Sequence, residues 1–305
     1  MRNALSIDVE EWWHILNLPS SPPREAWESL PATVEHNTHK LLEILDECGT
    51  RATFFVLGWV ARRHPALVRA IHAAGHEVAC HGDTHELCFE QGEQAFEADL
   101  RRARTTLEDL TGEAILGYRA PGFSILDDTT WAFEVIHRCG FRYDSSVFPA
   151  RRQHGGMRGA PRGPHSIVLA SGERLAEFPM TVAQWGPARI AFAGGGYLRL
   201  FPYPLIRSGI RRANRAGRPA CVYVHPREVD PEHPRMQMSL GRRFRSYTNL
   251  RSTEPKLRNL LRDFRFAPLA GVLRDHGLLE SSDPLGSRPE GSRPDPARTS
   301  ARTLP

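Results

Sequence analysis

Short apolar segments alternate with longer amphipathic segments through the first half of the chain. Four of the short segments are apolar and β-rich, as buried strands are: residues 4–8, 52–57, 76–80 and 115–118. The longer segments carry apolar residues at helical spacing, and several end at a glycine: residues 33–48, 59–74, 90–111 and 127–139. A regular alternation of strand and helix predicts an α/β fold around a parallel sheet.

The pattern changes after about residue 150. Residues 150–175 are rich in Gly, Pro and Arg and predict a long loop, and Gly194-Gly195-Gly196 predicts a flexible turn. Four further elements are expected: a strand end at 177–180, helices at 203–216 and 254–266, and a buried strand at 220–224. Residues 281–305 have few large apolar side chains, so we expect a disordered tail after one domain over residues 1–280.

Polar side chains stand where the apolar segments end. They are Asp8, Glu10, Glu11, His81, His85, Arg119, Asp144 and His225. In a barrel of parallel strands, the carboxyl ends of the strands meet on one face, and that face carries the active site. We therefore expect these side chains to gather at one end of the fold.

The pair His81 and His85 indicates a metal site. Imidazole is a preferred ligand of zinc and similar cations, and two histidines with a carboxylate leave coordination positions open for water. A cation held there would lower the pKa of water and polarise a carbonyl group. A second carboxylate could accept a proton, and a separate histidine could protonate a leaving group. This set of residues favours metal-assisted hydrolysis of an amide or an ester.

Charge and cysteine content limit the other function classes. The formal net charge is +5 and the pI is about 9.2, but Lys40 and Lys256 are the only lysines and the densest basic stretch, 242–245, is short. We therefore expect no nucleic-acid binding. The five cysteines form no disulfide framework, and no signal peptide or apolar run of bilayer length is present, which predicts a cytoplasmic protein, at most peripheral to the inner membrane.

The order of the motifs resembles the polysaccharide deacetylases of the NodB-homology type, carbohydrate esterase family four. The motifs are Ser6-Ile7-Asp8, Ala52-Thr53-Phe54-Phe55-Val56, His81-Gly82-Asp83-Thr84-His85, Arg119-Ala120-Pro121-Gly122-Phe123-Ser124, Tyr143-Asp144 and Val224-His225. The resemblance covers about residues 4–230 and implies an irregular (β/α) barrel of about seven parallel strands. Residues 176–275 further resemble the C-terminal part of deacetylases from exopolysaccharide clusters of the exosortase type, so 176–280 is expected to be specific to that branch.

The resemblance implies a role for each matching residue. Asp8 matches the catalytic base, and Arg119 matches the arginine that orients it. His225 matches the catalytic acid, and Asp144 matches an acidic motif that tunes it, although Asp-Ser-Ser is also capping chemistry. His81 and His85 match the ligands of a divalent metal, expected to be Zn²⁺.

The third metal ligand departs from the common family pattern, in which two aspartates are adjacent. Here the neighbour of Asp8 is Val9, which cannot bind a metal. Some branches of the family place the two acids two positions apart, which favours Glu10. Side chains of a strand alternate between its faces, so Asp8 and Glu10 should point the same way. A turn at Glu10 would instead favour Glu11.

Three functions follow. The first is an N-deacetylase acting on an amino sugar of an exopolysaccharide or of its lipid-linked precursor, with exopolysaccharide assembly proteins at the membrane as partners. The second is an amidohydrolase acting on a small ureide or cyclic imide, as in related branches. The third is a catalytically silent glycan-binding homologue, in which Val9 marks a lost metal site. No oligomeric state is predicted.

Overall fold

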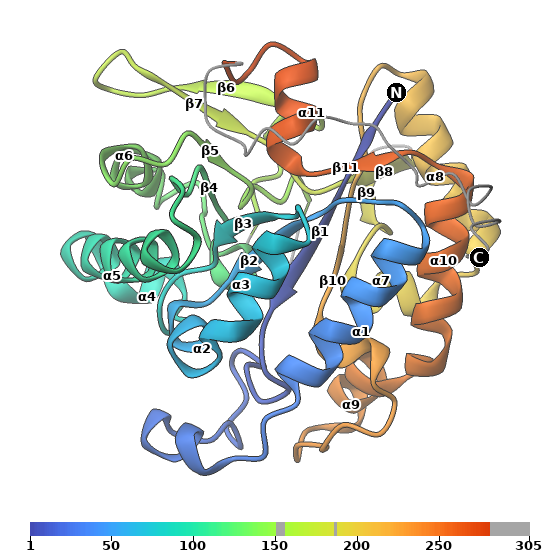
Figure 1. The fold of residues 1–305 in the computed structure, drawn as a ribbon. Helices are drawn as coiled ribbons and strands as arrows, with labels where there is room; N and C mark the ends of the chain where they lie inside the picture. Colours follow the sequence, from blue (N-terminus) through green and yellow to red (C-terminus); the bar gives the residue numbers. More distant parts are fainter. Residues whose placement is uncertain (151–155, 186–187, 281–305) are drawn as a thin grey trace, which may run out of the picture.

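A curled, mostly parallel sheet forms the centre of the protein (Figure 1), in a computed structural model that describes residues 1–150, 156–185 and 188–280. In spatial order its strands are β10 (Cys221–Val224), β1 (Asn3–Val9), β2 (Thr53–Val56), β3 (Glu77–Cys80), β4 (Gly117–Tyr118), β5 (Tyr143–Asp144), β7 (Arg174–Glu177) and β6 (His165–Val168). Only β6 runs antiparallel to its neighbour. The seven other strands are parallel, which confirms the expected barrel-like α/β fold.

Helices surround this sheet, and most of them pack against its outer face. They are α1 (Val34–Glu47), α2 (Gly58–Arg63), α3 (Pro65–Ala73), α4 (Cys88–Gln91), α5 (Glu93–Thr111), α6 (Trp131–Arg138), α7 (Gly195–Leu200), α8 (Tyr203–Arg215), α9 (Leu240–Tyr247), α10 (Thr253–Asp263) and α11 (Leu269–Asp275). Short β11 (Phe266–Ala267) pairs with the start of β1, so α11 lies at the amino ends of the strands, opposite α9 in Figure 1. A separate hairpin, β8 (Val182–Trp185) and β9 (Ala188–Ala191), stands outside the main sheet.

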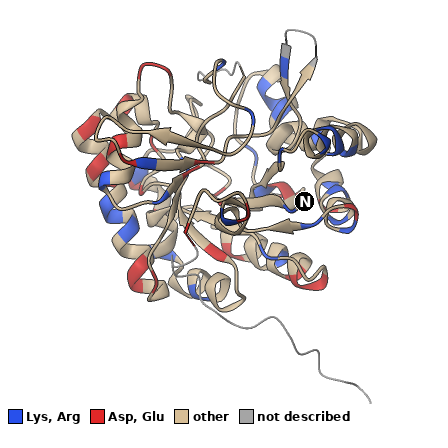
Figure 2. Cartoon of the chain, turned by 90° about the horizontal axis from the view of Figure 1, so that it is seen from above, with Lys and Arg blue, Asp and Glu red and all other residues tan. Residues whose placement is uncertain are grey.

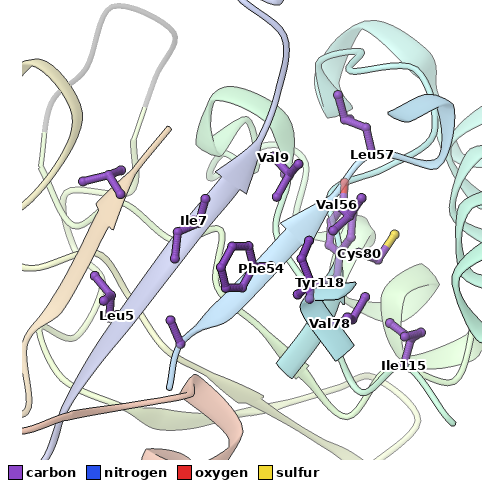
Figure 3. Close-up of a cluster of buried hydrophobic side chains, with 14 of the residues drawn as sticks. Leu5, Ile7, Val9, Phe54, Val56, Leu57, Val78, Cys80, Ile115 and Tyr118 are labelled. Atoms are coloured by element: carbon purple, nitrogen blue, oxygen red, sulfur yellow. The ribbon is translucent and has the colours of Figure 1, made fainter. Parts of the chain in front are cut away.

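The alternation of β1 divides the core into two layers. Leu5, Ile7 and Val9 lie together on one side of the sheet (Figure 3) and belong to the same buried cluster as helix residues such as Val34. Each of these buried side chains stabilises the fold by roughly 1.5–3 kcal/mol. The residues between them face the interior of the curled sheet, and one of these is Asp8. The side chains of this strand therefore alternate between its two faces as predicted, and Val9 is fully buried.

A polar network closes the amino end of the interior. The Glu77 carboxylate accepts hydrogen bonds from the Thr53 hydroxyl (2.5 Å), the Tyr143 hydroxyl (2.9 Å) and the Ala270 amide (3.2 Å). Burial raises the pKa of Glu77, although these donors partly offset the effect. The network ties β2, β3 and β5 to the first turn of α11.

The gap between β7 and β10 is bridged by side-chain and backbone contacts of the connecting chain. Thr181 Oγ1 accepts the amide hydrogen of Cys221 at 2.6 Å, and the amide of Tyr223 donates to the carbonyl of Ala193 at 3.2 Å. The barrel is thus irregular at this seam. Among the described residues, no helix is both long and apolar enough to cross a bilayer.

Several element predictions need correction. The helix expected at 59–74 divides at His64, because Pro65 has no amide hydrogen to continue the first helix and begins a new one. The helix expected at 90–111 is likewise preceded by α4, with Gly92 at a φ of 73° between the two. The loop expected at 150–175 contains β6 and the first residues of β7, which pair with each other across the sheet edge.

The prediction of a flexible turn at 194–196 was also wrong, because α7 begins at Gly195. A Cβ at Gly194 would lie 2.1 Å from the Tyr223 ring, so glycine is required there by close packing rather than by flexibility. Residues 151–155 of the expected loop and the expected tail, 281–305, lie outside the described residues.

Charged residues of both signs are distributed around the outer helices, as the view from above in Figure 2 shows. Many of them form exposed pairs, such as Arg101 with Glu97 and Arg138 with Glu97. Exposed pairs of this kind contribute at most about 1 kcal/mol each. The net positive charge is therefore not gathered into one face in this view.

Candidate active site

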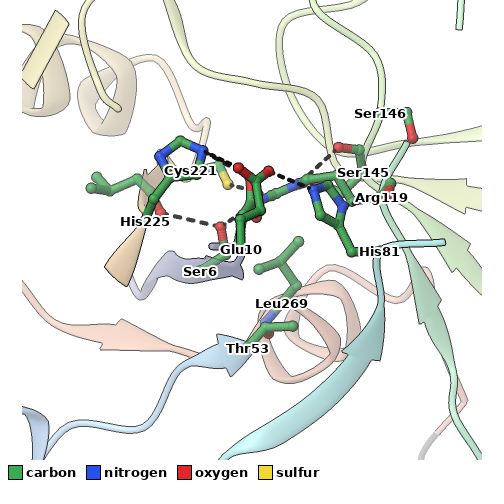
Figure 4. Close-up of polar contacts among 12 residues, drawn as sticks. Ser6, Glu10, Thr53, His81, Arg119, Ser145, Ser146, Cys221, His225 and Leu269 are labelled. Carbon is green, nitrogen blue, oxygen red and sulfur yellow. Dashed lines mark hydrogen bonds and ion pairs between the residues drawn. The ribbon is translucent and has the colours of Figure 1, made fainter. Parts of the chain in front are cut away.

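A pocket of about 580 Å³ opens at the carboxyl ends of β1 and β10. Its deeper wall is made by six polar side chains: Asp8, Glu10, His14, His85, His225 and Arg227. Loops and helices that follow other strands complete the wall, including α7 and α9. The expected gathering of polar residues at strand ends is therefore found, and Figure 4 shows the Glu10 carboxylate between His225 and His81.

Two imidazoles converge on one carboxylate oxygen. Oε1 of Glu10 lies 3.0 Å from Nε2 of His81 and 2.9 Å from Nε2 of His85. All three side chains are buried. Donor atoms of three residues this close together form a group that could hold a metal ion, with the two-histidine, one-carboxylate composition of open catalytic zinc sites.

The hydrogen bonds of His81 fit a cation at this point. Its Nδ1 lies 2.8 Å from the carbonyl oxygen of Arg119, which can only accept, so Nδ1 carries a proton and donates. In the neutral ring, Nε2 then directs a lone pair at the Glu10 carboxylate. A cation between these two acceptors would stabilise the arrangement, and the carbonyl partner fixes the tautomer that binds metals.

The loop after β3 aims the second imidazole. His85 has a φ of 59°, a left-handed conformation uncommon for residues with side chains, and Gly82 has a φ of 80°. Asp99 of α5 holds the loop by accepting the Asp83 amide at 2.8 Å and the Thr84 hydroxyl at 3.1 Å. Helix α5 thereby stabilises a strained turn that brings both rings to Glu10.

Arg119 binds Asp8 from inside the sheet. The guanidinium is fully buried and donates to Oδ1 of Asp8 at 2.6 Å and to the Ser6 hydroxyl at 2.7 Å. It also contacts Ser145 and lies over the Phe55 ring at 4.1 Å. One oxygen of Asp8 is therefore fixed by the arginine, and the other, Oδ2, lies 3.9 Å from Nε2 of His225.

The carboxylate that holds His225 is Glu228. Oε2 of Glu228 lies 3.2 Å from Nδ1 of His225 and accepts the His225 amide hydrogen at 3.0 Å. Glu228 is buried against Arg199 at 3.3 Å. Burial disfavours its charge, but Arg199, His225 and Arg227 together lower the pKa of Glu228 to about 2. It therefore stays ionised beside the imidazole.

The expectation that Asp144 tunes His225 stays a prediction. Both of its oxygens accept hydrogen bonds from Ser146, one from the amide at 2.9 Å and one from the hydroxyl at 2.6 Å. Its other neighbour is Glu177, whose pKa is raised well above the usual value by burial and by the Asp144 charge. Asp144 thus caps the turn after β5, and the structure records no contact between its side chain and His225.

Glu10 and Glu11 have separate environments. Burial disfavours a charged Glu10, yet the charges of His85, His225 and Arg227 and the hydrogen bond to His81 lower its pKa well below the usual value. Arg227 donates to Oε2 of Glu10 at 2.7 Å. Glu11 instead accepts the amides of Thr33 and Val34 at the start of α1, and burial raises its pKa. The structure therefore brings Glu10, not Glu11, to the two histidines.

Two parts of the sequence match known families. Residues 26–143 match the family described as polysaccharide deacetylase, and residues 145–274 match a domain of unknown function (DUF3473). Residues 26–143 are therefore similar to a polysaccharide deacetylase domain. The second match covers most of 176–280, and the exosortase-associated branch stays a prediction.

Named relatives match about a quarter to a third of this chain. A peptidoglycan deacetylase-like protein of Gibberella zeae is 36% identical over 110 residues, which is 35% of this chain and 32% of that protein. A peptidoglycan deacetylase of Helicobacter pylori is 32% identical over 108 residues, 35% of this chain and 36% of that protein. A chitooligosaccharide deacetylase of Rhizobium leguminosarum is 38% identical over 72 residues, 24% of this chain and 34% of that protein. The chain thus spans about a third of each relative's length.

A solved structure with 22% identity matches nearly the whole chain. It comes from Mycobacterium smegmatis and is assigned to the polysaccharide deacetylases, with a TM-score of 0.59, 22% identity and coverage of 94% of this chain and 93% of that one. At this identity the match shows a shared fold.

The pocket contains residues of both matched ranges and of the segment that precedes them. His81, His85 and Arg119 lie inside the first matched range, whereas Asp8 and Glu10 precede it and His225 lies in the second. Sequence reasoning missed Arg227 and Glu228, which contact the predicted residues directly. The spacing of Glu228, three residues after His225, is that of a capping box and could have revealed this contact.

Proposed function

We propose that this protein is a metal-dependent hydrolase that removes acetyl groups from an N-acetylated amino sugar of an exopolysaccharide or of its lipid-linked precursor. The proposal rests on three features that lie together at one pocket. Glu10, His81 and His85 form a group that could hold a metal ion. The Asp8 carboxylate and the His225 imidazole line the same pocket. This set matches the needs of amide hydrolysis.

His81, His85 and Glu10 would hold the divalent cation, for which we favour Zn²⁺. When bound, such a cation polarises the amide carbonyl and activates water for attack. The carboxylate of Asp8 accepts the proton of the attacking water through Oδ2, because Arg119 engages Oδ1 and fixes the orientation. A new C–O bond to the acetyl carbon forms in this step.

His225 completes the reaction as the acid. Its Nε2 lies 3.9 Å from both Asp8 and Glu10, at the edge of the pocket where a leaving nitrogen can reach it. Glu228 holds Nδ1 on the opposite side of the ring. Protonation of the sugar nitrogen lets the C–N bond break, which releases acetate and a free amine.

The substrate class is supported by the relatives' names, which are peptidoglycan deacetylases and a chitooligosaccharide deacetylase. The open pocket mouth suits a saccharide better than a small ureide or imide. A silent glycan-binding role is disfavoured because Glu10 occupies the position that Val9 cannot fill. Action near exopolysaccharide assembly proteins at the inner membrane remains part of the proposal.

Acetate release from N-acetylated oligosaccharides tests the proposal directly. Purified protein should release acetate, lose this activity on exhaustive chelation and regain it with zinc or cobalt. Full activity after verified removal of metal would refute the metal's role. Zinc binding without acetate release from any glycan would favour the silent homologue, and turnover of cyclic imides alone would favour the amidohydrolase.

Asp8→Asn separates the base from the metal group. The variant removes the proton acceptor and keeps Glu10, His81 and His85, so zinc content should be retained while kcat falls by about 10²- to 10⁴-fold. Metal analysis and initial rates on the same preparation decide the outcome. Loss of zinc in Asp8→Asn would instead make Asp8 a metal ligand.

A further inference from the structure

Each carboxylate deep in the pocket has its own arginine. Asp8 pairs with Arg119 at 2.6 Å, Glu10 with Arg227 at 2.7 Å, and Glu228 with Arg199 at 3.3 Å. These pairs balance the buried charge, as buried ions require. The positive charge of the remaining pocket arginines is therefore not needed to neutralise the catalytic carboxylates.

Two further arginines, Arg242 and Arg245 of α9, line the mouth of the same pocket, and we call them the rim pair. Neither forms an ion pair with a carboxylate within the described residues 1–150, 156–185 and 188–280. Arg242 donates to the backbone carbonyls of Leu16 and Asn17, and Arg245 is exposed. Burial and the neighbouring charge of Arg245 lower the pKa of Arg242, which is consistent with two cations held close together.

The rim pair is built on a fixed support. Arg199 of α7 is buried and donates to the carbonyls of Arg245 at 2.9 Å and Ser246 at 2.6 Å. The same Arg199 contacts Glu228, which holds His225. Two like charges held near each other repel, and an anion bound between them would offset this repulsion.

We propose that the rim pair binds an anionic group of the glycan substrate, a carboxylate or a phosphate, while the N-acetyl group lies at Glu10 and the histidines. This inference rests on the proposed deacetylase function and names its substrate class. Guanidinium groups bind both oxyanions through paired hydrogen bonds. A carboxylate would come from an acidic sugar in the chain, and a phosphate from the lipid-linked precursor.

Three soluble substrates distinguish these sources: a neutral N-acetylated tetrasaccharide, the same compound with one glucuronate residue, and the neutral compound with a 1-phosphate. Wild-type protein should use at least one anionic compound with a kcat/KM about 10-fold or more above the neutral one. Raising KCl from 50 to 300 mM should reduce this preference, because salt screens exposed charges. Preference for the glucuronate compound identifies an acidic sugar, and preference for the phosphate identifies the precursor.

Arg243 provides a matched control on the same helix. It carries the same charge and is exposed, but it does not line the pocket. Arg245→Gln should reduce the anionic-to-neutral ratio by about 5-fold or more, Arg245→Lys should restore part of it, and Arg243→Gln should leave it unchanged. Equal effects of Arg245→Gln and Arg243→Gln, or equal use of all three substrates by wild-type protein, would overturn the inference.

Direct binding separates this inference from the proposed function. Titration of the three compounds into the zinc-loaded protein, followed by calorimetry, should give tighter binding of an anionic compound and a loss of that difference in Arg245→Gln. Acetate release from all three compounds with no preference for an anionic one would contradict the inference and still support the deacetylase function. Charge-selective binding without any acetate release would remove the function and leave the rim pair as an anion site.

Discussion

The two ends of the curled sheet both contain buried carboxylates, and they use them differently. At the amino end, the Glu77 carboxylate accepts hydrogen bonds from neutral donors, and burial raises its pKa. At the carboxyl end, Glu10 faces imidazoles and Arg227, and its pKa is lowered well below the usual value. The surroundings of Glu77 shift its pKa toward the neutral form, whereas those of Glu10 shift its pKa toward the ionised form.

The difference follows from what closes each end. Helix α11 covers the amino end, where its Ala270 amide donates to Glu77 and its Leu269 amide donates to the Thr53 hydroxyl. The carboxyl end is left open to a pocket of about 580 Å³ and keeps cationic partners around its carboxylates. A buried acid is thus a structural or a chemical group according to the charge of its partners, not according to its burial.

The largest expected effect concerns the open end. Glu10→Ala should weaken zinc affinity by about 10-fold or more and reduce turnover at fixed zinc, because a carboxylate of the metal-type group is lost. Glu11→Ala serves as the control, since Glu11 caps α1 and should cost only ~1 kcal/mol of stability. Zinc titration of both apo proteins gives the answer, and weaker binding by Glu11→Ala than by Glu10→Ala would reverse the assignment.

A smaller effect is expected at the partner of His225. Glu228→Gln keeps the size of the side chain and removes the charge beside Nδ1, so kcat should fall roughly 10-fold or more while KM and zinc affinity stay near wild type. A residue with only a structural role would change stability and not this kcat–KM split. Asp144→Asn, which alters the carboxyl that the sequence favoured, should reduce kcat less, and the opposite ranking would restore Asp144 as the tuning group.

The smallest effect belongs to the closed end. The pKa of Glu77 is raised on folding, so above the unfolded value of about 4.3 the folded protein keeps a proton that the unfolded chain has released. The free energy of unfolding therefore decreases with rising pH by up to about 1.4 kcal/mol per unit for this group, until the folded pKa is reached.

Glu77→Gln removes that contribution. Relative to wild type, the variant should gain stability between pH 4 and pH 7 in urea unfolding, with no such relative change below pH 4. Activity and zinc affinity should be those of wild type. Parallel plots of unfolding free energy against pH for the two proteins would contradict the prediction, because they would show that folding does not raise the pKa of Glu77.

Site residues that directly follow a strand could be predicted from the sequence. Asp8, His81, Arg119 and His225 follow apolar segments, and parallel strands bring such positions together whatever the loops do. Glu10 could be favoured over Glu11 because side chains alternate along a strand. The fold class followed from the same alternation of elements.

Partners that depend on loop geometry were not predictable in this way. Glu228 contacts His225 across the short helix Pro226–Val229, and the capping-box spacing of the two residues was a signal that sequence reasoning did not use. The rim pair depends on how α9 packs against α7 through Arg199. The position of the rim pair is therefore set by tertiary packing, which local sequence pattern does not specify.

Arg119 both orients Asp8 and holds the interior of the sheet together. The guanidinium that fixes Asp8 also lies against Phe55 and binds Ser145 across the interior. A library that randomised this position in search of new substrates would lose folded protein and active protein together. Directed evolution should therefore spare the interior and diversify α9, where side chains at the pocket mouth can change without disturbing the alignment of the base.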